Sequence, residues 1–217
     1  MVYTNLSIPI VDVRRLTIHD GPGLRDTIFV KGCPLHCAWC HNPESISACV
    51  QLQFFAKLCK KCGHCVQICP AKAHYFNLDG EHQLERRRCN ACGACVKTCL
   101  HDALRLCGAP EFDVPQTLKI VLKDKTFYEQ SGGGVTISGG EPLLYPEFVK
   151  ELFLKLQAQN IHTALDTCGA VPWENFLLIL PYTSLILYDL KGMDAQQHKR
   201  NTGKDNIRIL QNLKQLD

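Results

Sequence analysis

Outside residues 50–110, short apolar runs alternate with longer stretches of helical periodicity. Four runs predict β-strands, at residues 27–30, 135–137, 161–165 and 184–188. Apolar residues at helical spacing predict helices over residues 114–130, 146–160 and 205–216. Strands that alternate with helices are typical of parallel βαβ units. The predicted fold class is therefore α/β, with parallel strands in an open sheet or a barrel.

Each predicted strand is followed by a residue suited to binding or chemistry. Cys33, Glu141, Asp166 and Asp189 come at or just after the carboxyl ends of the four runs. Parallel sheets and barrels collect their active sites at those ends, so we expect the four side chains to lie close together. Taken singly, Asp166 and Asp189 are also typical of helix N-caps.

The segment Gly139-Gly140-Glu141 has two interpretations. Paired glycines after a strand are common in a simple turn. Glycine also lets another group approach the backbone closely, and a neighbouring carboxylate suits a ligand ammonium group. The position of this segment at a strand end favours a ligand site.

Composition indicates a globular chain with one or two domains. Of its 217 residues, 46% are hydrophobic and 21% are charged. The N-terminal residues carry no basic stretch followed by an apolar run, and no apolar run reaches about 18 residues. We therefore expect no secretory signal, no membrane association and a cytoplasmic location.

The chain has 14 cysteines, and most stand at the intervals of metal ligands. This clustering favours metal or cluster ligation over disulfides. Cys33, Cys37 and Cys40 offer three thiolates in a Cys-x3-Cys-x2-Cys spacing. A [4Fe–4S] cluster needs four ligands, so three cysteines would leave one iron open to a substrate. His36 and His41 lie nearby, but a further protein ligand would close that position.

Two four-cysteine runs repeat at an interval of 30 residues. The runs are Cys59, Cys62, Cys65, Cys69 and Cys89, Cys92, Cys95, Cys99. This spacing resembles the bacterial two-cluster ferredoxin run, in which the fourth cysteine of each run ligates the other cluster. On that pattern Cys99 joins Cys59, Cys62 and Cys65 at a second cluster, and Cys69 joins Cys89, Cys92 and Cys95 at a third. Paired zinc sites are the alternative, although zinc prefers two cysteine pairs separated by a longer loop.

Positive charge is concentrated in the segment that carries this repeat. Residues 57–107 hold nine Lys/Arg and four Asp/Glu, whereas the remaining residues hold 15 and 17. A basic segment can bind nucleic acid. Here it is better explained as an offset to negatively charged clusters, or as a surface that attracts an acidic electron carrier, so we expect no nucleic-acid partner.

Taken together, these motifs make the chain resemble the radical S-adenosylmethionine superfamily, and within it the glycyl-radical-enzyme activating enzymes. The resemblance covers nearly the whole chain. It rests on residues 19–25 (His-Asp-Gly-Pro-Gly-Leu-Arg), 29–33, 39–44, 138–142 (Ser-Gly-Gly-Glu-Pro), 166–167 and 189–191. The repeat resembles the two-cluster insert of one subgroup of these enzymes.

The resemblance implies a reaction, its cofactors and its partners. The cluster at Cys33, Cys37 and Cys40 would bind S-adenosylmethionine and cleave it reductively to a 5′-deoxyadenosyl radical. That radical would abstract a hydrogen atom from a backbone glycine of a partner enzyme. Three [4Fe–4S] clusters, S-adenosylmethionine and a flavodoxin or ferredoxin-type reductant are implied. The implied cofactor contacts are Trp39, Cys40, His41, Gly139, Gly140, Glu141, Asp166, Asp189, Leu190 and Lys191.

The predicted domains are a partial barrel, residues 1–50 and 110–217, and an insert, residues 51–109. The family barrel has six βα units and only four are recognisable, so we expect a C-terminally truncated chain with uncertain activity. Two other functions stay open: an electron-transfer protein that has lost catalysis, and an enzyme that acts on a small molecule. We expect Cys49, Cys107 and Cys168 to be small buried residues without a ligand role.

Overall fold

The computed structural model describes residues 6–217 and divides them into two compact units. One unit consists of the described residues up to Ala48 together with Pro110–Asp217. The other consists of Cys49–Ala109 and is called the insert below. Each unit is described by itself.

The larger unit is built on a six-stranded sheet in the order β10-β9-β8-β2-β1-β7. Its strands are β1 (Ile8–Thr17), β2 (Arg25–Val30), β7 (Glu111–Phe112), β8 (Gly134–Gly139), β9 (His162–Thr167) and β10 (Leu185–Tyr188). The strands β2, β8, β9 and β10 are mutually parallel, whereas β1 is antiparallel to both β2 and β7. The predicted α/β class with parallel strands is confirmed.

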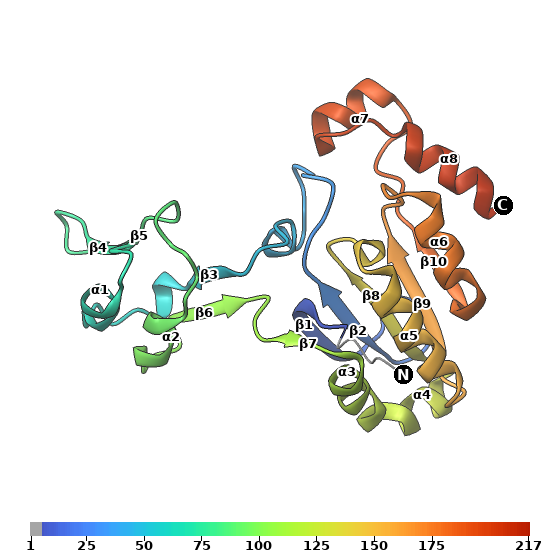
Figure 1. The fold of residues 1–217 in the computed structure, drawn as a ribbon, viewed down its shortest axis with the longest axis horizontal. Helices are drawn as coiled ribbons and strands as arrows, with labels where there is room; N and C mark the ends of the chain where they lie inside the picture. The colour runs from blue at the N-terminus through green and yellow to red at the C-terminus, as the bar shows by residue number, and fades with distance from the viewer. Residues whose placement is uncertain (1–5) are drawn as a thin grey trace. The chain divides into compact units, whose positions relative to one another are not determined.

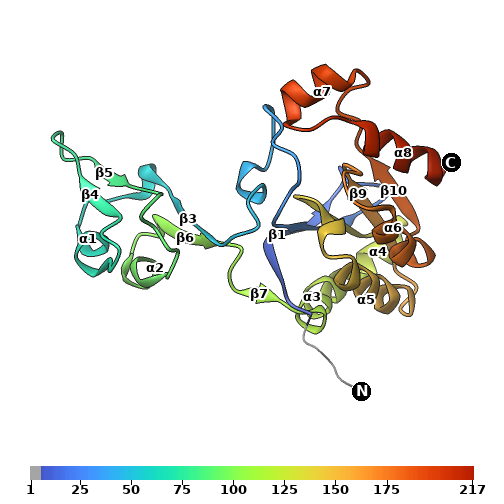
Figure 2. The same ribbon diagram turned by 45° about the horizontal axis from the view of Figure 1, so that its top comes forward.

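Six α-helices accompany this sheet in the larger unit. They are α3 (Val114–Val121), α4 (Lys125–Ser131), α5 (Pro146–Gln157), α6 (Trp173–Ile179), α7 (Ala195–Thr202) and α8 (Ile207–Leu216). Figures 1 and 2 show α5 between α3 and α6, alongside the strands. The apolar face of α5 supplies much of the core: Phe148, Val149, Leu152, Phe153 and Leu156 are all fully or almost fully buried.

The predicted helix over residues 114–130 is two helices in the structure. A 3₁₀ turn, Leu122–Asp124, separates α3 from α4. Asp124 at that turn is buried and accepts hydrogen bonds of 2.5 Å from Nε and Nη2 of Arg15 on β1. This ion pair ties the interruption to the sheet. The helices predicted at 146–160 and 205–216 are α5 and α8, each slightly shorter than expected.

The insert consists of two matching halves. In one, α1 (His64–Ile68) accompanies a hairpin of β4 (His74–Phe76) and β5 (His82–Leu84); in the other, α2 (Ala94–Thr98) accompanies β3 (Gln51–Phe54) and β6 (Leu104–Cys107). Both strand pairs are antiparallel. Each helix follows a glycine with a left-handed backbone, Gly63 at φ 80° and Gly93 at φ 77°.

Candidate functional site

A cavity of about 310 Å³ lies in the larger unit, lined by residues from the carboxyl ends of the parallel strands. We call it the barrel cavity. Its lining residues are Cys33, Leu35, Cys37, Trp39, Cys40, His41, Asn42, Ser138, Gly139, Gly140, Asp166, Thr167, Cys168, Asp189 and Lys191. The sequence predicted most of the chemically active members of this set. Glu141 and Leu190, which were also predicted, are not among them.

The loop that carries the three cysteines is fixed by backbone hydrogen bonds at both ends. Cys33 donates its N–H to the carbonyl of Ile46 at 2.9 Å. Further along, the N–H groups of His36 and Ala38 donate to the carbonyls of Thr202 and Asn201, at 2.7 and 2.9 Å. The loop is therefore held against the carboxyl end of α7, a helix that the apolar pattern did not predict.

Cys168 is a fourth thiol in the wall of the barrel cavity. It is buried and packs against Cys33 and Cys37 in a small cluster with Leu35 and Ile209. A hydrogen bond from Cys168 lowers the pKa of Cys33, and the same bond together with burial raises the pKa of Cys168. The Cys168 thiol thus lies within hydrogen-bond distance of both Cys33 and Glu141. Cys49, Cys107 and Cys168 were all predicted to be buried. The prediction is confirmed for Cys107 and Cys168 and is wrong for Cys49, which is exposed.

Charged side chains line one side of the same cavity. Lys191 forms an ion pair with Asp189. Burial lowers the pKa of Lys191, but this ion pair, together with Cys37 and Cys168, raises the pKa overall. Asp166 lies within β9 and accepts a 2.6 Å hydrogen bond from the Ser138 hydroxyl on β8, so it is not a helix N-cap. Burial raises the pKa of Asp166, and the negative charge of Asp189 adds to that effect.

Glu141 lies behind the cavity wall, fully buried. Its carboxylate accepts three hydrogen bonds: from the N–H of Leu143 at 3.0 Å, the hydroxyl of Thr167 at 2.8 Å and the N–H of Cys168 at 2.9 Å. Burial raises the pKa of Glu141, and a hydrogen bond from the Cys168 thiol, together with these three, opposes the effect. The side chain therefore joins the segment after β8 to the end of β9.

The glycines of the Gly139-Gly140 pair serve the packing of the sheet as well as the cavity. Gly139 has φ 108°, and a Cβ there would lie 2.4 Å from the backbone nitrogen of Val30. A Cβ on Gly140 would lie 2.0 Å from the carbonyl oxygen of Gly32. Only glycine fits at these two positions, because backbone atoms of the β2 segment occupy the space of a side chain.

The insert contains two smaller cavities, each bordered by four cysteines. Insert cavity 1 is lined by Cys59, Cys62, Cys65 and Cys99, together with His82, Leu104 and others. Insert cavity 2 is lined by Cys69, Cys89, Cys92 and Cys95, together with Leu52, His74 and others. The grouping follows the crossed pattern, with the fourth cysteine of each run beside the other run. Four thiols around one cavity are a donor set that suits an iron–sulfur cluster.

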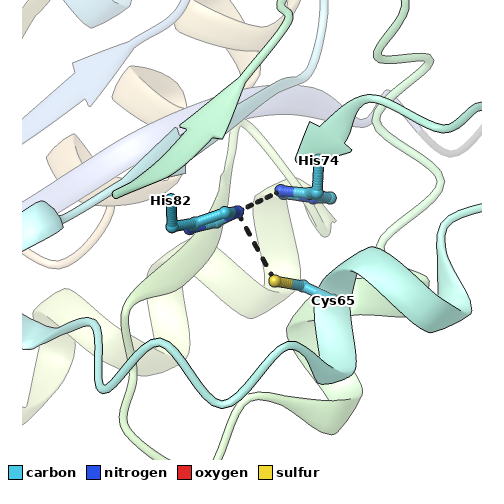
Figure 3. A group of neighbouring side chains, drawn as sticks. All are labelled: Cys65, His74 and His82. Atoms are coloured by element: carbon cyan, nitrogen blue, oxygen red, sulfur yellow. Dashed lines mark hydrogen bonds between the residues drawn. The ribbon is translucent and has the colours of Figure 1, made fainter. Parts of the chain in front are cut away.

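Another group of ligand atoms lies at the edge of insert cavity 1. One atom each from Cys65, His74 and His82 lies within 4.8 Å of the others, close enough to hold a metal ion (Figure 3). Neither histidine was predicted to take part in a site. In the larger unit and the insert alike, none of the helices described for residues 6–217 has the length and apolar character to cross a membrane.

Comparison with known proteins gives consistent matches. The model of the radical SAM superfamily matches residues 27–217. A (2S)-3-sulfopropanediol dehydratase activating enzyme from Klebsiella oxytoca is 44% identical over 211 residues, 95% of this chain and 66% of that protein. A trans-4-hydroxy-L-proline dehydratase activating enzyme from Clostridioides difficile is 42% identical, covering 95% and 68%. A benzylsuccinate synthase activating enzyme from Thauera aromatica is 41% identical, covering 97% and 65%. The chain spans about two thirds of the length of these relatives.

Proposed function

The chain belongs to the radical SAM superfamily and, within it, to the glycyl-radical-enzyme activating enzymes, and we propose that it cleaves S-adenosylmethionine to generate a radical on a partner enzyme. The observation that carries this proposal is the composition of the barrel cavity. Three cysteines of one loop border it together with Asp166, Asp189 and Lys191 from neighbouring strand ends.

The donor set of the barrel cavity fits a cluster with one open iron. Cys33, Cys37 and Cys40 would hold it, and Cys168, a neutral thiol hydrogen-bonded to Cys33, would support it without closing the open position. When bound, such a cluster supplies the electron that splits S-adenosylmethionine into methionine and a 5′-deoxyadenosyl radical, which takes a hydrogen atom from a glycine.

The protein's own side chains would bind and orient S-adenosylmethionine. Lys191 offers an ammonium group to a carboxylate, and Asp166 and Asp189 offer carboxylates to ammonium or hydroxyl groups. Gly139 and Gly140 line the cavity, so their backbone would border a ligand ammonium there. Glu141 would act indirectly, by holding the wall of the cavity in place. Trp39 and His41 border the cavity and would help to exclude water from a reactive radical.

The insert is proposed to carry two further [4Fe–4S] clusters, at the cysteine sets of insert cavities 1 and 2. A ferredoxin-like arrangement would pass electrons from a flavodoxin or ferredoxin. The net positive charge of residues 57–107 would attract such acidic carriers. Fourteen cysteines without a disulfide fit a reducing compartment such as the cytoplasm, which is part of this proposal.

The partner is proposed to be a glycyl radical enzyme. The relatives carry the names of several different partners, among them a sulfopropanediol dehydratase and a hydroxyproline dehydratase. They therefore support the partner class rather than one member of it. The glycyl radical enzyme encoded nearest to this chain in its genome is the first partner to test.

The test has two steps under anaerobic conditions. The reconstituted chain, given dithionite and S-adenosylmethionine, is expected to release 5′-deoxyadenosine, and co-expression with the partner is expected to give the electron paramagnetic resonance (EPR) doublet of a glycyl radical. Cys37→Ala should abolish both signals, whereas Cys49→Ala, outside all three cavities, should retain them. Clusters without 5′-deoxyadenosine would favour electron transfer. 5′-Deoxyadenosine without the doublet on any partner would favour a small-molecule substrate.

A further inference from the structure

Two buried histidines connect the two cavities of the insert. His82 on β5 lines insert cavity 1, and His74 on β4 lines insert cavity 2. The exposed fractions of His74 and His82 are only 3% and 5%. Nδ1 of His74 and Nε2 of His82 lie 2.9 Å apart, and the two rings stack with centroids 5.0 Å apart (Figure 3). One hydrogen bond therefore links a side chain of each cavity.

His82 also contacts two cysteines of the first set. Its Nδ1 is 3.6 Å from Sγ of Cys59, and its Nε2 is 3.5 Å from Sγ of Cys65. Phe54 packs edge-on against the His82 ring, with the two ring centroids 4.4 Å apart. The centroid of the Phe76 ring lies 5.9 Å from that of His82. Because aromatic rings hold the imidazole on two sides, its nitrogens stay directed at sulfur atoms.

At the other end of the pair, Nε2 of His74 is buried and has no hydrogen-bond partner among residues 6–217. An unpaired buried nitrogen is costly and calls for an explanation. His74 borders a cavity lined by Cys69, Cys89, Cys92 and Cys95. A neutral His74 that donates its Nδ1–H to His82 has only a lone pair on this nitrogen, so Nε2 needs no acceptor.

The internal repeat shows that the fold does not require histidine at these positions. An offset of 30 residues relates His74 to Leu104. The repeat likewise relates His82 to Leu52. His82 pairs with Phe76, and Leu52 pairs with Leu106, which is the repeat equivalent of Phe76. Leu52 and Leu104 are buried and line insert cavities 2 and 1, respectively. Each cavity thus has one leucine and one histidine at matched positions, so apolar residues satisfy the packing there.

A metal ion held by Cys65, His74 and His82 is less consistent with these contacts. A metal would need the lone pairs of the two nitrogens, yet these nitrogens already share a hydrogen bond. Cys65 also lines insert cavity 1 with Cys59, Cys62 and Cys99, which complete a four-thiol set. The histidines therefore suit a position beside the ligands, where hydrogen bonds to sulfur tune a cluster.

We propose that the hydrogen-bonded pair of His74 and His82 is a positioning element that directs the Nδ1–H of His82 at Cys59 and raises the reduction potential of the cluster held in insert cavity 1. The proposal rests on the clusters of the proposed function. A hydrogen bond to ligand sulfur stabilises the more negative, reduced state of a cluster, so its potential rises. Two neutral imidazoles carry two N–H groups, of which one lies between the rings. The other points from Nδ1 of His82 to Cys59, so His82→Leu removes the donor, and His74→Leu removes the partner that fixes the tautomer of His82.

The experiment uses the full chain with Cys33→Ala, Cys37→Ala and Cys40→Ala, which leaves only the insert clusters. Redox titrations monitored by EPR compare this parent with His82→Leu and His74→Leu, the residue found at the matched repeat positions. We expect His82→Leu to lower the equilibrium constant for reduction of the cluster in insert cavity 1 about tenfold, which is about 59 mV for one electron. His74→Leu should lower the same equilibrium constant by a smaller factor, and neither variant should change the potential of the cluster in insert cavity 2. Tyr75→Leu, an exposed residue of β4 outside both insert cavities, is the control, with less than about a twofold change expected on the same scale.

The results separate this proposal from the proposed function. A parent chain that binds zinc, or far fewer than about eight iron atoms, would disprove the cluster assignment itself. Clusters that assemble fully but keep the parental potentials in both leucine variants would overturn the role of the histidine pair. If His82→Leu loses its clusters, His82→Gln decides, because it keeps an N–H donor: a potential near that of the parent supports that role, and a tenfold loss contradicts it.

Discussion

The buried carboxylate of Glu141 allows a sharp test of whether this residue binds the ligand or supports the site. The change is Glu141→Ala. It removes the acceptor for two backbone N–H groups, those of Leu143 and Cys168, and for the hydroxyl of Thr167. All three bonds are 3.0 Å or shorter, and Glu141 is fully buried. Water cannot replace the lost acceptor without entering the new cavity.

The magnitude follows from the number of donors left unpaired. Each buried donor that loses its acceptor costs about 1 to 3 kcal/mol. Partial hydration of the cavity reduces the sum, so we expect Glu141→Ala to lower the free energy of unfolding of the larger unit by about 3 to 5 kcal/mol. Glu147→Ala, an exposed residue in the first turn of α5, should change it by less than about 0.5 kcal/mol.

The assay is urea denaturation followed by circular dichroism, combined with S-adenosylmethionine binding to the folded, reconstituted protein. A structural role predicts a large loss of stability. It also predicts that binding weakens only as far as the cavity wall shifts. If Glu141→Ala unfolds at the urea concentration of the parent and yet fails to bind, Glu141 is a direct ligand contact and the reasoning from its hydrogen bonds is refuted.

Three further predictions concern single residues of the larger unit. Gly140→Ala should destabilise it by about 3 kcal/mol, since the new Cβ would overlap the Gly32 carbonyl at 2.0 Å; thermal unfolding measures this, and an unchanged midpoint would contradict it. Cys168→Ala should keep full iron content in the barrel cavity but lower the potential of that cluster, because Cys33 loses its donor; lost iron would instead make Cys168 a ligand. Burial raises the pKa of Asp26 to about 6, so the folded state holds this proton more tightly and stability falls as pH rises from about 4 to about 6. Asp26→Asn should lack that fall in stability. Urea denaturation midpoints of both proteins are compared at pH 5 and 7.5, and an equal change in the two proteins would refute the role of Asp26.

The sequence was most informative about the central strands. Every residue of β2 is buried, so its run of apolar residues was easily recognised. β1 was missed because its second half alternates towards solvent, with Asp12 and Arg14 exposed. α7 was missed for a similar reason: it is largely polar, and its ends are set by the cap residues Asp194 and Gly203. Polar helices and antiparallel neighbours depend on tertiary contacts that a periodicity search does not detect.

The order of cysteines predicted more of the insert than its strands did. Ligand spacing is local, so the two four-cysteine runs were visible in the sequence, and so was the crossed grouping that matches the residues of the two insert cavities. The short strands β4 and β5 gave no signal of their own. Without that pairing, His74 and His82 are eight residues apart and unrelated. Only the hairpin brings them into contact.

The direction of a side chain at a strand end was the hardest feature to predict. Glu141 and Cys168 occupy similar places. Glu141 lies two residues beyond the end of β8, and Cys168 directly follows the last residue of β9. The carboxylate of Glu141 turns away from the cavity because unpaired N–H groups of Leu143 and Cys168 lie behind the wall and need an acceptor. Cys168 donates its own N–H to that carboxylate, so its side chain is left beside Cys33 at the cavity. One buried carboxyl group therefore fixes both directions. For this reason a motif identifies which residues surround the site, whereas the donors and acceptors behind it decide which of them can reach a ligand.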